Sequence, residues 1–238
     1  MAKQKDFDTF LRNIEPSKTT VQYVSSVQNS LRDYLRQHKT YSNVHKETFL
    51  SGSYAKHTSI RPTKEDNKRD VDIIVVTTHS QDDDSSKVLQ ELYDVLVASS
   101  TYRSATIQHH SVGIELSQLS IDVVPVIVDK DDDSLYWIAD SEDGTWTNSD
   151  PKGHKNWSTE TNQNNNNNYK PLVKIFKWWR RKHCPGGVKY PKGITLEKLI
   201  ADNLGDSSAS TEDFLIETMQ NIVSAYKKAY DYFLLGTL

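Results

Sequence analysis

Two aspartates, Asp70 and Asp72, are separated by one residue at the start of a β-branched, apolar run. Because successive side chains of a β-strand point to opposite faces, this spacing predicts that both carboxylates share one face. Val71, Ile73 and Val75 are then expected on the other face, in the core. Neighbouring carboxylates repel each other, and a hard cation such as Mg²⁺ prefers their oxygen atoms as ligands. The pattern predicts a metal site, against the alternative that the pair only caps a turn or meets solvent.

A third carboxylate, Asp122, lies inside the apolar run 119–128, which has the composition of a strand. An aspartate in such a run is costly to bury unless something compensates its charge. If this strand lies beside the strand of Asp70, three carboxylates converge. Three carboxylates can hold two Mg²⁺ ions, or Mn²⁺ in their place, about 3.5–4 Å apart, an arrangement that supports in-line phosphoryl transfer.

A Gly-Ser pair, Gly52–Ser53, follows the apolar run 48–50 and precedes the two aspartates. Glycine permits a positive φ or a close backbone approach. The following residues, 54–58, are predicted to begin a short helix, whose free N–H groups would favour a phosphate. The alternative is a tight turn capped by serine. Gly-Ser alone carries little information, but beside D-V-D it indicates a phosphate-binding turn.

These motifs together resemble a known superfamily. The sequences G-S-Y-A-K-H-T at 52–58, D-V-D-I-I at 70–74 and I-D-V-V-P at 121–125 are similar to those of DNA polymerase β-like nucleotidyltransferases. Within them, the chain most resembles the branch that holds oligoadenylate synthases, cyclic GMP–AMP synthase and the bacterial CD-NTases of anti-phage (CBASS) systems. A second resemblance lies at 169–181, where L-V-K-I-F-K-W-W-R-R is similar to the helix behind the nucleotide.

The resemblance implies an α+β fold: a polymerase β-like catalytic lobe over residues 1–160, with a mixed β-sheet and helices, and a C-terminal helical lobe over 161–238. It also implies that Asp70 and Asp72 bind both metal ions and that Asp122 binds the catalytic one. The residues that it places at the nucleotide are Gly52, Ser53, Thr58, Lys177, Lys174 and Thr195. The resemblance implies that Lys177 contacts the phosphates of the donor nucleotide, with Lys174 as the second candidate. The alternative is that either lysine only faces solvent.

The remaining elements follow from hydrophobic periodicity. Helices are predicted over 17–39 (capped by Ser17 and packing on both lobes), 88–96, 169–182, 196–204 (capped by Thr195) and 211–235. Strands are predicted over 106–109, 112–116 and 119–128, with a hairpin turn at 117–118 and an irregular segment over 134–161. Pro125 lacks an N–H donor, so its strand is expected at an edge or to end soon after. His109 and His110, as strand neighbours, are expected to point apart and not to form a paired metal ligand.

Composition limits the classes of function. The chain has 238 residues, one cysteine (Cys184) and a net charge of −3, with a mean hydropathy of −0.68. No run is long enough to span a membrane, and the N-terminus lacks the apolar stretch of a secretory signal, so a cytoplasmic protein without a membrane partner is expected. Basic groups such as Lys64, Lys68 and Arg69 suit a triphosphate better than a long duplex, and the sequence leaves nucleic acid binding open.

The expected reaction joins nucleoside triphosphates, with ATP among them, through phosphodiester bonds and releases pyrophosphate. The resemblance implies a short linear or cyclic second messenger and admits a regulatory protein partner. Three alternatives stay open: an RNA-end enzyme of the CCA-adding type, an enzyme that transfers AMP to a protein or tRNA end, and a catalytically silent nucleotide- or RNA-sensing module. The chain ends earlier than this branch leads us to expect, as a short member, a fragment or one part of a longer protein would.

Overall fold

The computed structural model describes residues 4–62, 68–183 and 193–235, with side chains through residue 226. Lys64 and Cys184, both named above, lie outside the described residues. The chain divides into two compact units, one of Pro16–Trp157 and one of Met1–Glu15 with Ser158–Leu238. The first 15 residues therefore group with the C-terminal segment, whereas the boundaries drawn from the sequence put them in the N-terminal lobe.

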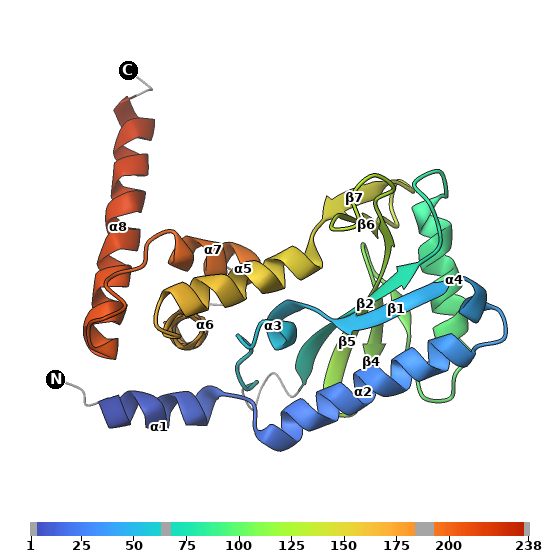
Figure 1. The fold of residues 1–238 in the computed structure, drawn as a ribbon, viewed down its shortest axis with the longest axis horizontal. Helices are drawn as coiled ribbons and strands as arrows, with labels where there is room; N and C mark the ends of the chain where they lie inside the picture. Colours follow the sequence, from blue (N-terminus) through green and yellow to red (C-terminus); the bar gives the residue numbers. More distant parts are fainter. Residues whose placement is uncertain (1–3, 63–67, 184–192, 236–238) are drawn as a thin grey trace. The chain divides into compact units, whose positions relative to one another are not determined.

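The Pro16–Trp157 unit is built on a seven-stranded mixed sheet in the order β1-β2-β5-β4-β3, with β6 pairing with β5 and β7 with β6 (Figure 1). The fold is α+β, as predicted. β2 and β5 are parallel and the other pairs are antiparallel. The strands are β1 (His45–Leu50), β2 (Arg69–Thr77), β3 (Thr106–Ile107), β4 (Val112–Glu115), β5 (Leu119–Val128), β6 (Tyr136–Ala139) and β7 (Trp146–Ser149).

Two helices cover one face of this sheet. They are α2 (Lys18–Gln37), where Ser17 caps the N-terminus by accepting a hydrogen bond from the Thr20 N–H, and α4 (Ser85–Val97), capped by Asp84. Their apolar residues form one core cluster with Val71, Ile73 and Val75 of β2. The predicted core face of β2 is confirmed, so Asp70 and Asp72 lie on the face opposite α2 and α4.

The central strand β5 corrects the expectation for Pro125. β5 continues for three residues beyond it, to Val128, and pairs on both sides, so it is neither an edge strand nor interrupted. On one side, β4 pairs with residues 120–123 and β6 with residues 126–128. Pro125 lies between these two antiparallel ladders, where neither needs its missing N–H.

Several predicted boundaries were wrong. The segment 134–161 is not irregular, because it contains β6, β7 and most of α5 (Pro151–Asn164). The helix expected over 54–58 is α3 (Gly52–Ala55), and the strand expected over 106–109 ends at Ile107. The hairpin turn at 117–118 is confirmed by a hydrogen bond from the Leu116 N–H to the Leu119 carbonyl, 2.8 Å long. β6 and β7 have only four residues each, and tertiary contacts rather than local periodicity determine such short strands.

The second unit is helical. Its elements are α1 (Gln4–Ile14), α6 (Tyr169–His183), α7 (Gly193–Ala201) and α8 (Thr211–Leu235), with the last part of α5. α1 was not predicted; its Phe10 ring packs edge-on against Trp178 of α6, with centroids 4.9 Å apart. Among the described residues, no helix combines the length and apolar character needed to cross a membrane.

Candidate active site

The three predicted aspartates lie on one face of the sheet. β2 and β5 are parallel neighbours, and Asp72 pairs in register with Asp122. Residues paired directly across neighbouring strands point to the same face, and Asp70, two residues before Asp72, shares it. The spacing D-x-D and the mid-strand aspartate therefore come together through one parallel pairing.

Burial and mutual repulsion act on these carboxyl groups. Burial, followed by the charges of Asp122 and Asp70, raises the pKa of Asp72. Burial, followed by the charge of Asp70, raises the pKa of Asp122. The ionised carboxylates are thus destabilised in the metal-free protein, and a divalent cation bound to their oxygens would relieve that cost. This oxygen-only donor set fits Mg²⁺ or Mn²⁺.

The Gly52 turn lies directly against Asp72. Gly52 has a φ of +58°, and a Cβ added to it would lie 1.8 Å from Oδ2 of Asp72. The Ser51 N–H donates a 2.9 Å hydrogen bond to the Asp72 carbonyl. Only glycine allows the turn to approach this carboxylate so closely, so the Gly-Ser pair adjoins the acidic face, as the motif spacing suggested.

Ser53 and Thr58 close this turn. The Thr58 N–H donates a 2.9 Å hydrogen bond to the Ser53 carbonyl, and Thr58 is fully buried. Thr58 thereby fixes the backbone that carries Ser53. Its proposed contact with the nucleotide stays a prediction.

Sequence reasoning missed Lys56, which follows α3. This lysine is only 6% exposed, and its positive charge lowers the pKa of Asp72, opposing the aspartate repulsion. Its position inside the G-S-Y-A-K-H-T segment could have pointed to a role in the site. From sequence alone, however, a buried lysine beside a turn cannot be told from one that faces solvent.

Lys56→Met is expected to move the acid limb of the pH–rate profile to higher pH. Without the ammonium group, Asp72 holds its proton to a higher pH, so fewer molecules carry the ionised site. We expect kcat/KM near pH 7 to fall about 10-fold. Initial rates of pyrophosphate release between pH 5 and 9 measure this. Lys87→Met, at an exposed position of α4, is the charge-matched control. An unshifted limb in Lys56→Met would contradict this role.

Two further residues act on Asp122 and were also missed. Hydrogen bonds from the Gln108 and Ser111 side chains lower the pKa of Asp122, against the effect of burial. The Gln108 amide lies across Gly113, where an added Cβ would be 2.3 Å from its Nε2, and Gly113 pairs in register with Asp122. The turn between β3 and β4 thus supplies the polar neighbours of Asp122.

The three remaining predicted residues belong to the C-terminal unit. Lys177 Nζ lies 2.7 Å from Oε1 of Glu197, and both residues are buried; Lys174 Nζ lies 2.6 Å from Oε1 of Glu15. Thr195 is the third residue of α7, so the expected N-cap at this position was wrong. A nucleotide role for these residues stays a prediction.

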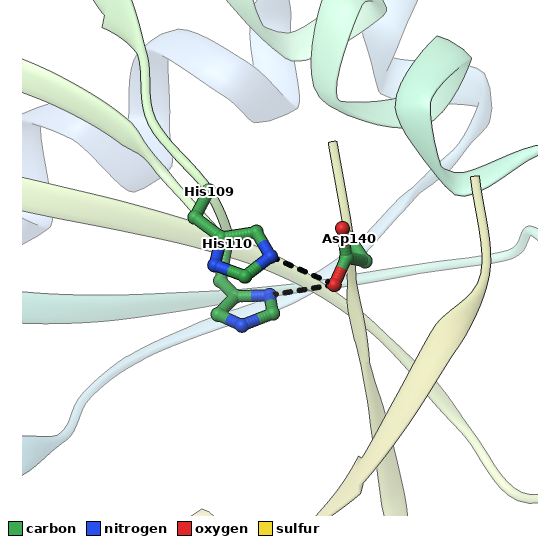
Figure 2. A group of neighbouring side chains, drawn as sticks. All are labelled: His109, His110 and Asp140. Carbon is green, nitrogen blue, oxygen red and sulfur yellow. Dashed lines mark hydrogen bonds and ion pairs between the residues drawn. The ribbon is translucent and has the colours of Figure 1, made fainter. Parts of the chain in front are cut away.

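The expectation that the side chains of His109 and His110 point apart was wrong. These residues lie beyond the end of β3, and their rings stack with centroids 3.9 Å apart. Both face Asp140 (Figure 2), and the ligating atoms of the three residues lie within 4.8 Å of one another. The expectation assumed a continuous strand, whereas the turn brings both rings to one side.

Comparisons with known proteins agree with this fold. Residues 1–162 match the family model "Second Messenger Oligonucleotide or Dinucleotide Synthetase domain" (SMODS). The chain is 39% identical over 229 residues to a cyclic AMP-AMP-AMP synthase of Acinetobacter sp. (strain ATCC 27244 / 9458), covering 95% of this chain and 66% of that protein. It thus spans slightly less than two thirds of that relative's length.

Solved structures share the fold. E. coli MS115-1 CdnC with ATP superposes with a TM-score of 0.70 at 23% identity, over 94% of this chain and 71% of that one. The CdnC:HORMA-deltaN complex from the same source gives a TM-score of 0.68 at 22% identity, over 92% and 70%. The fold is that of a polymerase β-like nucleotidyltransferase. With its SMODS match over more than half its length, this chain belongs to the second-messenger oligonucleotide or dinucleotide synthetase family, which confirms the resemblance to CD-NTases.

Proposed function

We propose that this chain is a divalent-metal-dependent nucleotidyltransferase that joins nucleoside triphosphates into a cyclic oligonucleotide. One observation carries the proposal: Asp72 and Asp122 pair in register on one sheet face, with Asp70 beside them and the Gly52 turn packed against Asp72. A purely structural role does not explain why three carboxylates lie together, because their mutual repulsion destabilises the fold. The division into a catalytic lobe and a helical lobe belongs to the same proposal.

Each residue has a distinct part in this reaction. Asp70 and Asp72 would hold two Mg²⁺ ions and Asp122 one of them. When bound, these ions supply charge neutralisation for the triphosphate and lower the pKa of the acceptor hydroxyl. Asp122 would accept the hydroxyl proton. Gly52 and Ser53 present backbone and hydroxyl donors to the donor phosphates, and Thr58 keeps their turn closed.

ATP is the substrate that the relative's name favours, because a cyclic AMP-AMP-AMP synthase uses adenine nucleotides alone. We further propose a role in bacterial anti-phage signalling and control by a partner protein, as the neighbouring CdnC:HORMA-deltaN complex suggests. Lys177 and Lys174 are the proposed phosphate contacts of the helical lobe, and Thr195 lies in the segment proposed to approach the base. On nucleotide binding, the Lys177 ammonium group would either leave Glu197 to contact the triphosphate or contact Glu197 and the triphosphate together.

The decisive experiment incubates the protein with each NTP and with all four, in Mg²⁺ or Mn²⁺. Phosphatase-resistant products are then identified by mass spectrometry. We expect a cyclic product that contains AMP, and no product from Asp70→Ala or Asp72→Ala variants that retain the wild-type circular dichroism spectrum. Full activity in either variant would refute the assignment.

Two further measurements distinguish the proposed reaction from the alternative functions. Labelled ATP with tRNA or with the protein alone reports end addition or AMP transfer, and label in either macromolecule without a cyclic product would replace the present proposal. Tight NTP binding with no turnover, both alone and with a candidate partner protein, would identify a silent sensing module. The net charge of −3 gives no support to a broad tRNA-binding surface.

A further inference from the structure

We propose that His109, His110 and Asp140 form a second metal site, specific for a divalent transition metal such as Zn²⁺ and separate from the aspartates of β2 and β5. The three side chains come from the turn after β3 and the residue after β6, both within the Pro16–Trp157 unit. Metal binding here does not depend on the proposed catalytic activity.

The geometry is close to that of a zinc site. Oδ2 of Asp140 lies 2.9 Å from Nε2 of His109 and 3.9 Å from Nδ1 of His110 (Figure 2). Ligands bound tetrahedrally to zinc at about 2.0–2.2 Å are about 3.3–3.6 Å apart. These two separations lie on either side of this range, and all three ligand atoms lie within 4.8 Å of one another. Side-chain rotations that unstack the two imidazoles would bring the three atoms onto one ion.

Asp140 is held in place by its backbone surroundings. Its Oδ1 accepts a 2.8 Å hydrogen bond from the Glu142 N–H, which leaves Oδ2 facing the two imidazoles. Its backbone carbonyl accepts a 2.8 Å hydrogen bond from the Ser85 hydroxyl. The Ser141 N–H donates to the His109 carbonyl at 2.9 Å and ties the two segments together. Such outer contacts orient the ligands of known metal sites.

The donor chemistry separates this site from the acidic face. Imidazole nitrogen favours Zn²⁺, Cu²⁺ or Ni²⁺, whereas Mg²⁺ prefers oxygen ligands alone. His109 is half exposed, which leaves the site accessible, and Oε2 of Glu142 lies 3.9 Å from its Nε2, near enough to add a fourth ligand. Without a metal, Nε2 of His109 contacts Oδ2 of Asp140 and Nδ1 of His110 contacts the Ala139 carbonyl at 3.0 Å. A metal ion bound here would replace both contacts.

The site would also stabilise the turn that serves Asp122. His109 and His110 lie between Gln108 and Ser111, and the Gln108 N–H donates a 2.8 Å hydrogen bond to the Ser111 carbonyl. The side chains of Gln108 and Ser111 are those that lower the pKa of Asp122, and the Ser111 hydroxyl donates a 2.9 Å hydrogen bond to Oε1 of Gln108. Binding of a metal at the intervening histidines would fix this turn; its consequence for turnover rests on the proposed function, whereas its effect on stability does not.

The test titrates the purified full chain with Co²⁺, as a spectroscopic probe, and then with Zn²⁺, in excess Mg²⁺. We expect one equivalent of Co²⁺ to give the visible absorption of a four-coordinate ion, Zn²⁺ to displace it, and Zn²⁺ to raise Tm. His110→Ala and Asp140→Asn should each weaken binding about 10-fold or more and remove the rise in Tm. His154→Ala, an exposed histidine on α5, is the matched control.

A second variant separates this site from the catalytic aspartates. Asp70→Asn with Asp72→Asn should keep Co²⁺ binding while losing NTP turnover. Absence of a Co²⁺ band in the wild type, or binding unchanged in a folded His110→Ala protein, would overturn the proposal. Loss of binding only in the double aspartate variant would do the same, because it would assign the ion to the acidic face. Loss of turnover alone would bear only on the proposed function.

Discussion

Asp72→Asn is expected to abolish nucleotide transfer and, at the same time, to make the metal-free protein more stable. The substitution removes the charge that burial, Asp122 and Asp70 all disfavour, and it keeps nearly the same shape. Relief of such repulsion is worth about 0.5–2 kcal/mol, which raises Tm by about 2–4 °C per kcal/mol for a chain of this size. Thermal unfolding in EDTA, together with pyrophosphate release in Mg²⁺, measures both effects.

The stability of the wild type and of Asp72→Asn should also differ in how it depends on Mg²⁺ and on pH. Mg²⁺ should raise Tm of the wild type but not of Asp72→Asn, because binding to the native state is what stabilises it. A carboxyl group whose folded pKa is raised stabilises the protein fully below its unfolded pKa, and this contribution is lost as the pH rises through the folded pKa. The metal-free wild type should therefore lose stability over the pH range just above the ordinary aspartate pKa, and Asp72→Asn should lose less.

Asp131→Asn is the matched control for this experiment. It changes the net charge by the same amount in the exposed loop after β5, away from the three aspartates, and should leave turnover and the Mg²⁺ effect unchanged. Turnover near the wild-type level in Asp72→Asn, or a lower Tm in EDTA than the wild type, would show that Asp72 is not a repelled metal ligand.

The acidic face could be predicted because two simple periodicities determine it. The period of two in a strand puts Asp70 and Asp72 on one face, and a mid-strand Asp122 needs a polar environment wherever its strand pairs. That these strands are neighbours was only a condition in the sequence analysis, and the family resemblance implied that it is met. The register of Asp72 with Asp122 could not be derived from spacing, since the two residues are 50 positions apart, and only the family resemblance suggested it.

The neighbours of these aspartates could not be predicted, for a different reason. Lys56, Gln108 and Ser111 carry no local pattern, and their importance arises only when the fold brings them beside Asp72 or Asp122. The histidine pair was misjudged because strand alternation was applied beyond the end of β3 at Ile107. β3 ends two residues earlier than predicted, so the predicted side-chain directions after Ile107 no longer apply.

Pro125 shows how tertiary structure overrides a sound local rule. Proline is excluded from a strand where its N–H is needed by a neighbour, and the sequence gives no information on where neighbouring ladders start and stop. β4 ends its pairing at Val123 and β6 begins at Val126. β6, which was predicted as part of an irregular segment, thus pairs with β5 beyond Pro125 and leaves Pro125 between the two ladders.

Gly52→Ala is expected to have the other large effect, a loss of activity of about 100-fold or more with a clear loss of stability. The new Cβ would lie 1.8 Å from Oδ2 of Asp72 at a φ of +58°, so the turn or the carboxylate must move. A displacement of about 1 Å at reacting groups can cost about 100-fold, and overpacking costs about 1–3 kcal/mol. Pyrophosphate release and urea unfolding measure the two losses.

Gly144→Ala separates the clash with Asp72 from backbone strain alone. Gly144, between β6 and β7, also has a positive φ, of +71°, but its added Cβ would meet only the side chain of Asp84, at 2.9 Å from Oδ1. Both variants incur the cost of alanine in the left-handed region, yet only Gly52→Ala disturbs the acidic face. We therefore expect Gly144→Ala to be destabilised and to keep its turnover. Equal activity in the two variants would mean that the approach of Gly52 to Asp72 is not needed for catalysis, and that the turn serves the fold alone.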